Sequence, residues 1–95
     1  MININVHKIG ELAYQVSVSD GETGSWYRVL VPEGFYQRLT AGRISKIKCV
    51  EAAFRFLLDR RSKETIHSRF DLPEIQEVFP DFKKEFDQYA QLALS

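Results

Sequence analysis

The chain has 95 residues, of which 44% are hydrophobic and 27% are charged, and its formal net charge at pH 7 is zero. This length and balance predict one folded domain with a modest core, and they exclude a disordered chain and a fibrous repeat. The single cysteine, Cys49, has no partner for an internal disulfide. No apolar run approaches the roughly 20 residues that span a bilayer, and residues 2–9 do not resemble a secretory signal. We therefore expect a cytoplasmic protein that does not bind membranes.

The N-terminal third has the pattern of antiparallel strands. Apolar and polar residues alternate over residues 2–6 and again over residues 12–18, which predicts two half-buried strands. Turn-forming residues fill segment 19–25, and a third strand follows over residues 26–31. These segments predict an N-terminal antiparallel β-hairpin or a three-stranded sheet.

The third strand is apolar on both of its expected faces. Because side chains alternate along a strand, Trp26, Arg28 and Leu30 share one face. The opposite face carries one tyrosine and two valines. Either both faces are buried, or one face is reserved for a partner. Trp26 and Leu30 are therefore the candidate partner surface.

The longest periodic apolar segment, residues 43–61, predicts a central helix. Ser45 can cap its first turn, and the helix should end near Arg60 or Arg61. A helix that is apolar on one side must be covered by the remaining elements, so we expect it at the centre of the fold. The residues expected to be buried in it are Ile47, Val50, Phe54 and Leu57.

Short helices are predicted on both sides of the central one. Pro32 suits the first turn of a helix of two to three turns, and Gly42 suits the left-handed cap behind it. After the central helix, Ser62 can cap another short helix that runs to Arg69 and points Ile66 inward.

Two further helices are predicted near the C-terminal end. Asp71 and Glu74 can cap each other's backbone at the start of the first one, and Pro80 separates it from a last helix over residues 81–94. We therefore expect an α+β protein with a single domain, residues 1–95. In it a β-rich part, residues 1–31, precedes a helical part, residues 32–95, with four to five helices.

Charge is distributed unevenly along the chain. The net charge is −2 over residues 1–37, +6 over residues 38–63 and −4 over residues 64–95. Either the basic middle and the acidic end neutralise each other across the fold, or the basic segment binds an anion. Lysines at a helix start oppose the helix dipole, so they lack a stabilising role there. The candidate nucleic-acid or anion contacts are Arg28, Arg43, Ser45, Lys46 and Lys48.

The sequence shows no catalytic or cofactor motif. His7 and His67 are isolated, and Cys49 has no second cysteine at metal-binding spacing. The five glycines are scattered and form no phosphate-binding loop, and the acids of the C-terminal third fit solvated helix faces. We therefore expect no enzymatic activity, no catalytic residues, no cofactor and no metal. An enzyme that pairs either histidine with Cys49 is the remaining alternative.

Residues 27–58, YRVLVPEGFYQRLTAGRISKIKCVEAAFRFLL, resemble a ribbon-helix-helix DNA-binding module. The resemblance implies a dimer whose paired strands enter the major groove and whose second helix begins against phosphate at Ser45, Lys46 and Lys48. Pairing between residues 12–18 and 26–31 within one chain would occupy the strand edge that this family needs for pairing with its partner chain. Over most of its length the chain also resembles small bacterial proteins with a hairpin, an FLLxR-type helix and a Phe-Asp-Leu segment, which implies no function.

Two functions are expected on these grounds. The first is a small non-enzymatic domain that binds another protein, or a second copy of itself as a homodimer, through Trp26 and Leu30. The alternative is a ribbon-helix-helix-like DNA-binding regulator or antitoxin, which the basic segment and the resemblance favour.

Overall fold

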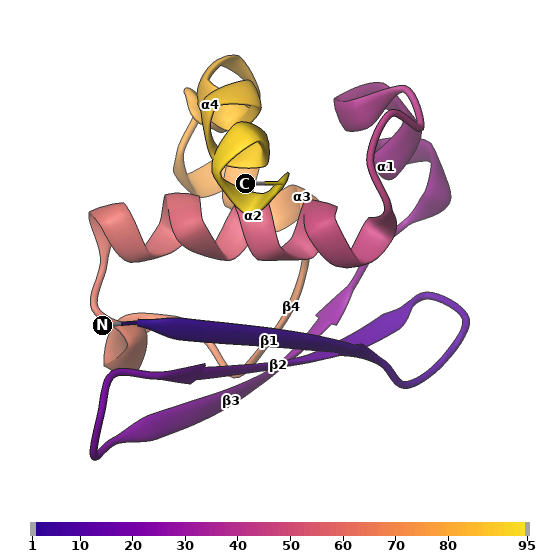
Figure 1. Ribbon diagram of the computed structural model, residues 1–95. Coiled ribbons are helices and arrows are strands. Elements are labelled where there is room, and N and C mark those ends of the chain that lie inside the picture. Colours follow the sequence, from indigo (N-terminus) through magenta and orange to yellow (C-terminus); the bar gives the residue numbers. More distant parts are fainter. Residues whose placement is uncertain (1, 95) are drawn as a thin grey trace.

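The computed structural model describes residues 2–94, which form an α+β fold of stacked layers (Figure 1). A four-stranded sheet is the first layer, the long helix α2 lies across one face of it, and α1 and α4 lie on the far side of α2. No helix in residues 2–94 has the length and apolar character needed to cross a membrane. In chain order the elements are β1 (Asn3–Lys8), β2 (Ala13–Ser19), β3 (Gly24–Leu30), α1 (Glu33–Thr40), α2 (Lys46–Arg60), the 3-10 helix η1 (Lys63–Thr65), β4 (Arg69–Asp71), α3 (Pro73–Val78) and α4 (Phe82–Leu94).

The sheet has the strand order β1-β2-β3-β4. The first three strands pair antiparallel, so that Val16 of β2 lies between Val6 of β1 and Tyr27 of β3. The expected three-stranded antiparallel sheet is therefore present. A fourth strand extends it, because β4 pairs parallel to β3 and sets Arg69 beside Arg28.

The helix predicted over residues 62–69 is wrong. Only η1 is helical there, and the chain then enters β4. The backbone N–H of Arg28 donates to the carbonyl of Ser68 at 2.7 Å, and that of Leu72 donates to the carbonyl of Leu30 at 2.9 Å. The edge of β3 gives the backbone groups of residues 68–72 hydrogen-bond partners. A short helix of residues with weak helix propensity would be less stable than this pairing.

The position of α2 follows from the large side chains on two of its sides. Phe54 packs against Tyr27 of the sheet, with ring centres 5.1 Å apart. Phe56 packs against Phe82 and Tyr89 of α4, with ring centres 4.9 and 5.5 Å away. Because both phenylalanines are fully buried, α2 is held between two layers.

The ends of α2 and most of its core agree with the sequence prediction. The Ser45 hydroxyl accepts a hydrogen bond from the Lys48 N–H at 3.1 Å, and the helix ends at Arg60. The exception is Ile47, whose side chain is 42% exposed. It lies one turn before the partly exposed Glu51, on a side of α2 that neither the sheet nor α4 covers. The expected core residues that are buried are Val50, Phe54 and Leu57.

The other helix ends also follow from local sequence. After α1 the chain turns at Ala41 and Gly42, both with positive φ, of 54° and 73°. At the start of α3 the Asp71 N–H donates to the Glu74 carboxylate at 2.8 Å, which is one half of the expected reciprocal cap.

Candidate functional site

One face of the sheet, here called the outer face, is not covered by any described helix (Figure 1). Trp26 and Leu30 of β3 point to this face and are 64% and 43% exposed. On the inner side of the same strand, Tyr27 and Val29 are only 3% and 0% exposed. The strand is therefore buried on one side only, and the candidate partner surface is open to solvent.

Two arginines lie side by side on the outer face. The parallel pairing of β3 and β4 makes Arg28 and Arg69 register partners, and both side chains are exposed. Neither guanidinium forms a hydrogen bond or an ion pair within residues 2–94. A hollow of about 180 Å³ is lined by both arginines together with Trp26, Gln15 and Ser68. Guanidinium groups stay charged at every physiological pH, so this hollow has a fixed positive charge.

On the β2 side, uncharged residues lie next to these side chains. Ser17, Gln15 and Ala13 of β2 lie opposite Trp26, Arg28 and Leu30. None of the three β2 residues has a charge. The outer face therefore combines one large aromatic ring, two free cations and the apolar side chain of Leu30, which has Asp71 as its register partner on β4.

At the start of α2 the basic side chains already have acidic partners. The ammonium of Lys46 lies 2.5 Å from a carboxylate oxygen of Glu33 and 5.4 Å from the ring centre of Tyr36. This pairing raises the pKa of Lys46 and lowers the pKa of the Glu33 carboxyl. Lys48 pairs with Glu51 at 3.3 Å.

The remaining predicted anion contacts do not complete a site there. Arg43 donates to the Thr40 carbonyl at 3.0 Å and lies 3.9 Å from the carboxylate of Asp87. The Ser45 hydroxyl is occupied by the cap bond of α2. Arg28 lies on the outer face, on the other side of the sheet from α2. The structure therefore separates Arg28 from the other four candidates.

Contacts between the basic middle and the acidic end of the chain are direct. Arg60 of α2 lies 2.7 Å from Asp81 and 3.2 Å from Glu85, and its guanidinium stacks on Phe56 at 3.9 Å from the ring centre. Together with the pair between Arg43 and Asp87, these contacts favour charge neutralisation within the fold.

A buried lysine, which the sequence did not reveal, joins the loop between β2 and β3 to η1. Lys63 is 6% exposed, and its ammonium donates to Thr23 at 2.8 Å, Asp20 at 3.2 Å and Glu64 at 2.6 Å. The Tyr27 hydroxyl donates to the Lys63 carbonyl at 2.5 Å. The hydrogen bond to Glu64 is the main reason that the pKa of Lys63 is raised. Partners about 40 residues apart leave no local pattern in a sequence.

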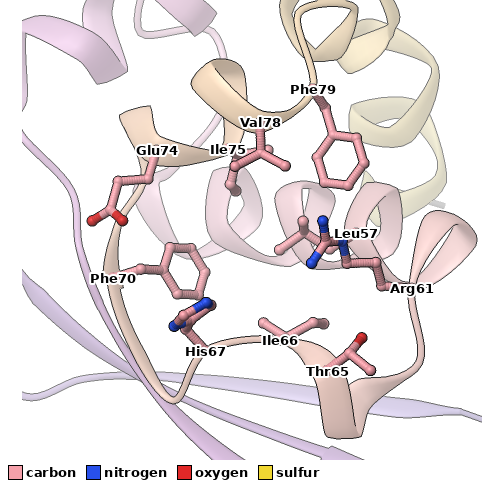
Figure 2. Close-up of a pocket in the computed structure, with 10 residues that line it drawn as sticks. All are labelled: Leu57, Arg61, Thr65, Ile66, His67, Phe70, Glu74, Ile75, Val78 and Phe79. Atoms are coloured by element: carbon pink, nitrogen blue, oxygen red, sulfur yellow. The ribbon is translucent and has the colours of Figure 1, made fainter.

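A second hollow, here called the α2–α3 pocket, has a volume of about 120 Å³ (Figure 2). It lies between the end of α2, the segment from η1 to β4, and α3. Arg61 and His67 are polar residues on its rim, and Val78 of α3, which also lines the pocket, is 56% exposed. Its apolar wall consists of Leu57, Ile66, Phe70, Ile75 and Phe79.

The histidines and the cysteine lie apart. Cys49 is fully buried, and burial raises the pKa of its thiol to about 12. His7 is an exposed residue of the edge strand β1, and His67 lines the α2–α3 pocket, which Cys49 does not reach. Within residues 2–94 no three His, Cys, Asp or Glu side chains are grouped so that they could hold a metal ion.

No family model matches the chain, and no curated protein or solved structure matches it either. The outer face and the α2–α3 pocket are therefore the basis for assigning a function.

Proposed function

We propose that this protein is a small non-enzymatic interaction domain that binds an acidic segment of another protein on its outer face. The observation that supports this most directly is the exposure of Trp26 beside Arg28 and Arg69, which have no acidic partner within residues 2–94. Tryptophan and arginine are the side chains most enriched among the residues that dominate binding energy at protein interfaces. A large exposed aromatic ring has no role in the core of this fold.

The two arginines favour a partner with carboxylates. Like charges on neighbouring strands repel each other, and no carboxylate in residues 2–94 is paired with either guanidinium. A bound Asp or Glu side chain would remove this repulsion and could accept two parallel hydrogen bonds from one guanidinium. An apolar residue next to that carboxylate would cover Trp26 or Leu30.

The same charges make a face-to-face homodimer unfavourable. A twofold interface places a patch against its own copy. Here the outer face carries Arg28 and Arg69, and Asp71, the register partner of Leu30, is its one acidic residue within the described strands. Because the patch has a net positive charge, a different and acidic protein is a better partner than a second copy.

The DNA-binding alternative has less support from the geometry. A ribbon-helix-helix module pairs its strand with that of a second chain, whereas β3 has β2 on one edge and β4 on the other. Single-stranded nucleic acids bind sheets through several stacked aromatic rings and a basic groove. Trp26 is the only Phe, Tyr or Trp among the outer-face residues of the described strands. We therefore favour a protein partner over a regulator or antitoxin that binds DNA.

Selection from a library of random peptides displayed on phage tests this proposal. On the immobilised wild-type protein, we expect enrichment of peptides that carry Asp or Glu beside an apolar residue. The variants W26A and R28E/R69E should lose this enrichment, because they remove the ring or reverse the charge of the patch. The matched control R38E/K84E changes the net charge equally at two exposed residues of α1 and α4, and it should retain the enrichment.

Four outcomes would contradict the proposal. Enriched peptides without an acidic preference, or equal enrichment on W26A, would show that the outer face does not recognise acidic segments. If size-exclusion chromatography with light scattering shows a dimer, and W26A dissociates that dimer, the partner is a second copy of this chain. Salt-dependent binding of DNA that R28E/R69E abolishes would instead support the nucleic-acid alternative.

A further inference from the structure

The α2–α3 pocket lies on the other side of the sheet from the outer face. Phe70 of β4 points into it, whereas Arg69, its neighbour in the same strand, belongs to the outer face. Figure 2 shows Arg61 and His67 on opposite sides of the pocket, with Ile66 between them. An apolar hollow with a cationic rim is therefore present in addition to the proposed partner surface.

Arg61 has a different role from Arg60, its neighbour in the chain. Arg60 is held between the carboxylates of Asp81 and Glu85. Arg61 has no carboxylate partner within residues 2–94, and its guanidinium lies 5.2 Å from the ring centre of Phe79 in the pocket wall. Stacking on an aromatic ring leaves the edge of a guanidinium free to donate hydrogen bonds to an anion.

The other polar groups of the pocket are consistent with an anionic ligand. His67 is exposed, has no hydrogen-bond partner within residues 2–94 and can serve as a donor. The Glu74 carboxylate accepts the Asp71 N–H at 2.8 Å and points away from the hollow in Figure 2. Among residues 2–94 Glu74 is the only carboxylate that lines the pocket, and it accepts a backbone hydrogen bond and forms no ion pair with Arg61.

The size of the pocket limits the apolar part of the ligand. Its volume is about 120 Å³, and it is open at one side. An enclosed apolar cavity of about 150 Å³ can hold benzene. One branched aliphatic group or one phenyl ring, of roughly four to six carbons on that comparison, would therefore fill this pocket.

We propose that the α2–α3 pocket binds a small apolar group that is joined to a carboxylate, either directly or through one carbon atom. The apolar group lies against Leu57, Phe70 and Phe79, and the carboxylate accepts hydrogen bonds from Arg61, with His67 as a second donor. Two sources supply this chemistry, a free small carboxylic acid and the last residue of a polypeptide with an apolar side chain. The site is independent of the outer face.

Titration of the full-length protein by NMR tests the proposal, with phenylacetate and isovalerate as probes. Both should shift the amide signals of pocket residues, and phenylacetamide, which lacks the charge, should bind at least about 10-fold more weakly. Acetate, which lacks the apolar group, should cause no saturable shift. Arg61→Gln should weaken phenylacetate binding about 10-fold or more, while the matched control Arg38→Gln on α1 should leave it unchanged.

Additional variants separate this site from the outer face and from loss of structure. Ile66→Phe adds bulk to the pocket and should reduce binding while the dispersed NMR spectrum is retained. W26A should not affect binding, because Trp26 lies across the sheet, so the failure of one proposal does not imply the failure of the other. Equal affinities for phenylacetate and phenylacetamide, or an unchanged affinity in Arg61→Gln, would overturn the proposal.

A last comparison distinguishes the two sources of the ligand. N-acetyl-leucyl-leucine has a free C-terminal carboxylate, and its amide does not. Tighter binding of this dipeptide than of isovalerate, abolished in its amide, would identify the end of a polypeptide as the ligand. Binding of isovalerate without binding of the dipeptide would identify a free small acid.

Discussion

Arg28 and Arg69 are register partners on the neighbouring parallel strands β3 and β4, and neither has an acidic partner within residues 2–94. Removing one of these charges should relieve the repulsion between them. We expect Arg69→Gln to raise the free energy of unfolding by about 0.2 to 1 kcal/mol at low salt, and by less at high salt. Urea denaturation at two ionic strengths measures this. A loss of stability at low salt would mean that the arginines do not repel each other.

The exposure of Trp26 can be measured directly, because it is the only tryptophan in the chain. Its fluorescence in the folded protein should be quenched by acrylamide almost as strongly as in the denatured protein. Trp26→Ala should change the free energy of unfolding by no more than about 0.5 kcal/mol, as expected for a surface residue. A shielded indole, or a large destabilisation, would mean that the ring is packed within the fold.

Periodic patterns predicted the elements that pack through one continuous apolar stripe. The sheet over β1 to β3 and the central helix with its Ser45 cap follow from alternation, helical spacing and capping chemistry. The prediction failed at β4, because its strand conformation depends on the edge of β3 about 40 residues earlier. It also failed at Ile47, because helical spacing alone does not show which sides of α2 are covered.

The sequence could also predict one of the candidate sites in part and could not predict the other. Exposure of Trp26 and Leu30 could be predicted as one of two alternatives, since a strand that is apolar on both faces needs two covering layers or a partner. The α2–α3 pocket combines residues from three separate segments, and the partner of Arg28 on the outer face comes from β4. Such combinations depend on tertiary packing, which local sequence patterns do not encode.

The cluster around Lys63 should make the protein sensitive to acid. The pKa of Asp20 is lowered mainly by the hydrogen bond from Thr23 and then by Lys63, and the pKa of Glu64 is lowered mainly by Lys63. Because both pKa values are lower in the folded state, the stability they add is complete above about pH 5 and is lost as the pH falls through the lowered values. Thermal melts between pH 7 and pH 3 should show this decline.

Lys63→Met tests the origin of that decline. The variant should melt at a lower temperature at pH 7, because Asp20 and Glu64 lose their buried donor, and it should depend less steeply on pH below 5. The melting temperature should still fall somewhat at low pH, because Arg60 lowers the pKa of Asp81 and Lys46 lowers the pKa of Glu33. An unchanged pH dependence in Lys63→Met would exclude the cluster as its cause.

Cys49 should be inert in the folded protein. Its thiol is fully buried, so it should react with an aromatic disulfide reagent only after denaturant is added. Burial raises its pKa from 9.0 to about 12. Between these two values the unfolded state binds fewer protons than the folded state, so stability should fall as the pH rises. Cys49→Ala should show a weaker alkaline decline. The remaining decline reflects groups whose pKa values are also raised, namely Tyr14, Tyr27, Tyr89, Lys46 and Lys63.

Because α2 packs against the sheet on one side and against α4 on the other, we expect both contacts to be essential to the core. Phe54→Ala should remove the contact with Tyr27, and Phe56→Ala should remove the contacts with Phe82 and Tyr89. Each substitution should lower the free energy of unfolding by about 3 to 5 kcal/mol, because both rings are fully buried. Ile47→Ala, in the same helix, is the control and should cost less than about 1.5 kcal/mol, since that side chain is 42% exposed. Urea denaturation gives all three values, and equal losses for Ile47 and Phe54 would contradict the layered packing of α2.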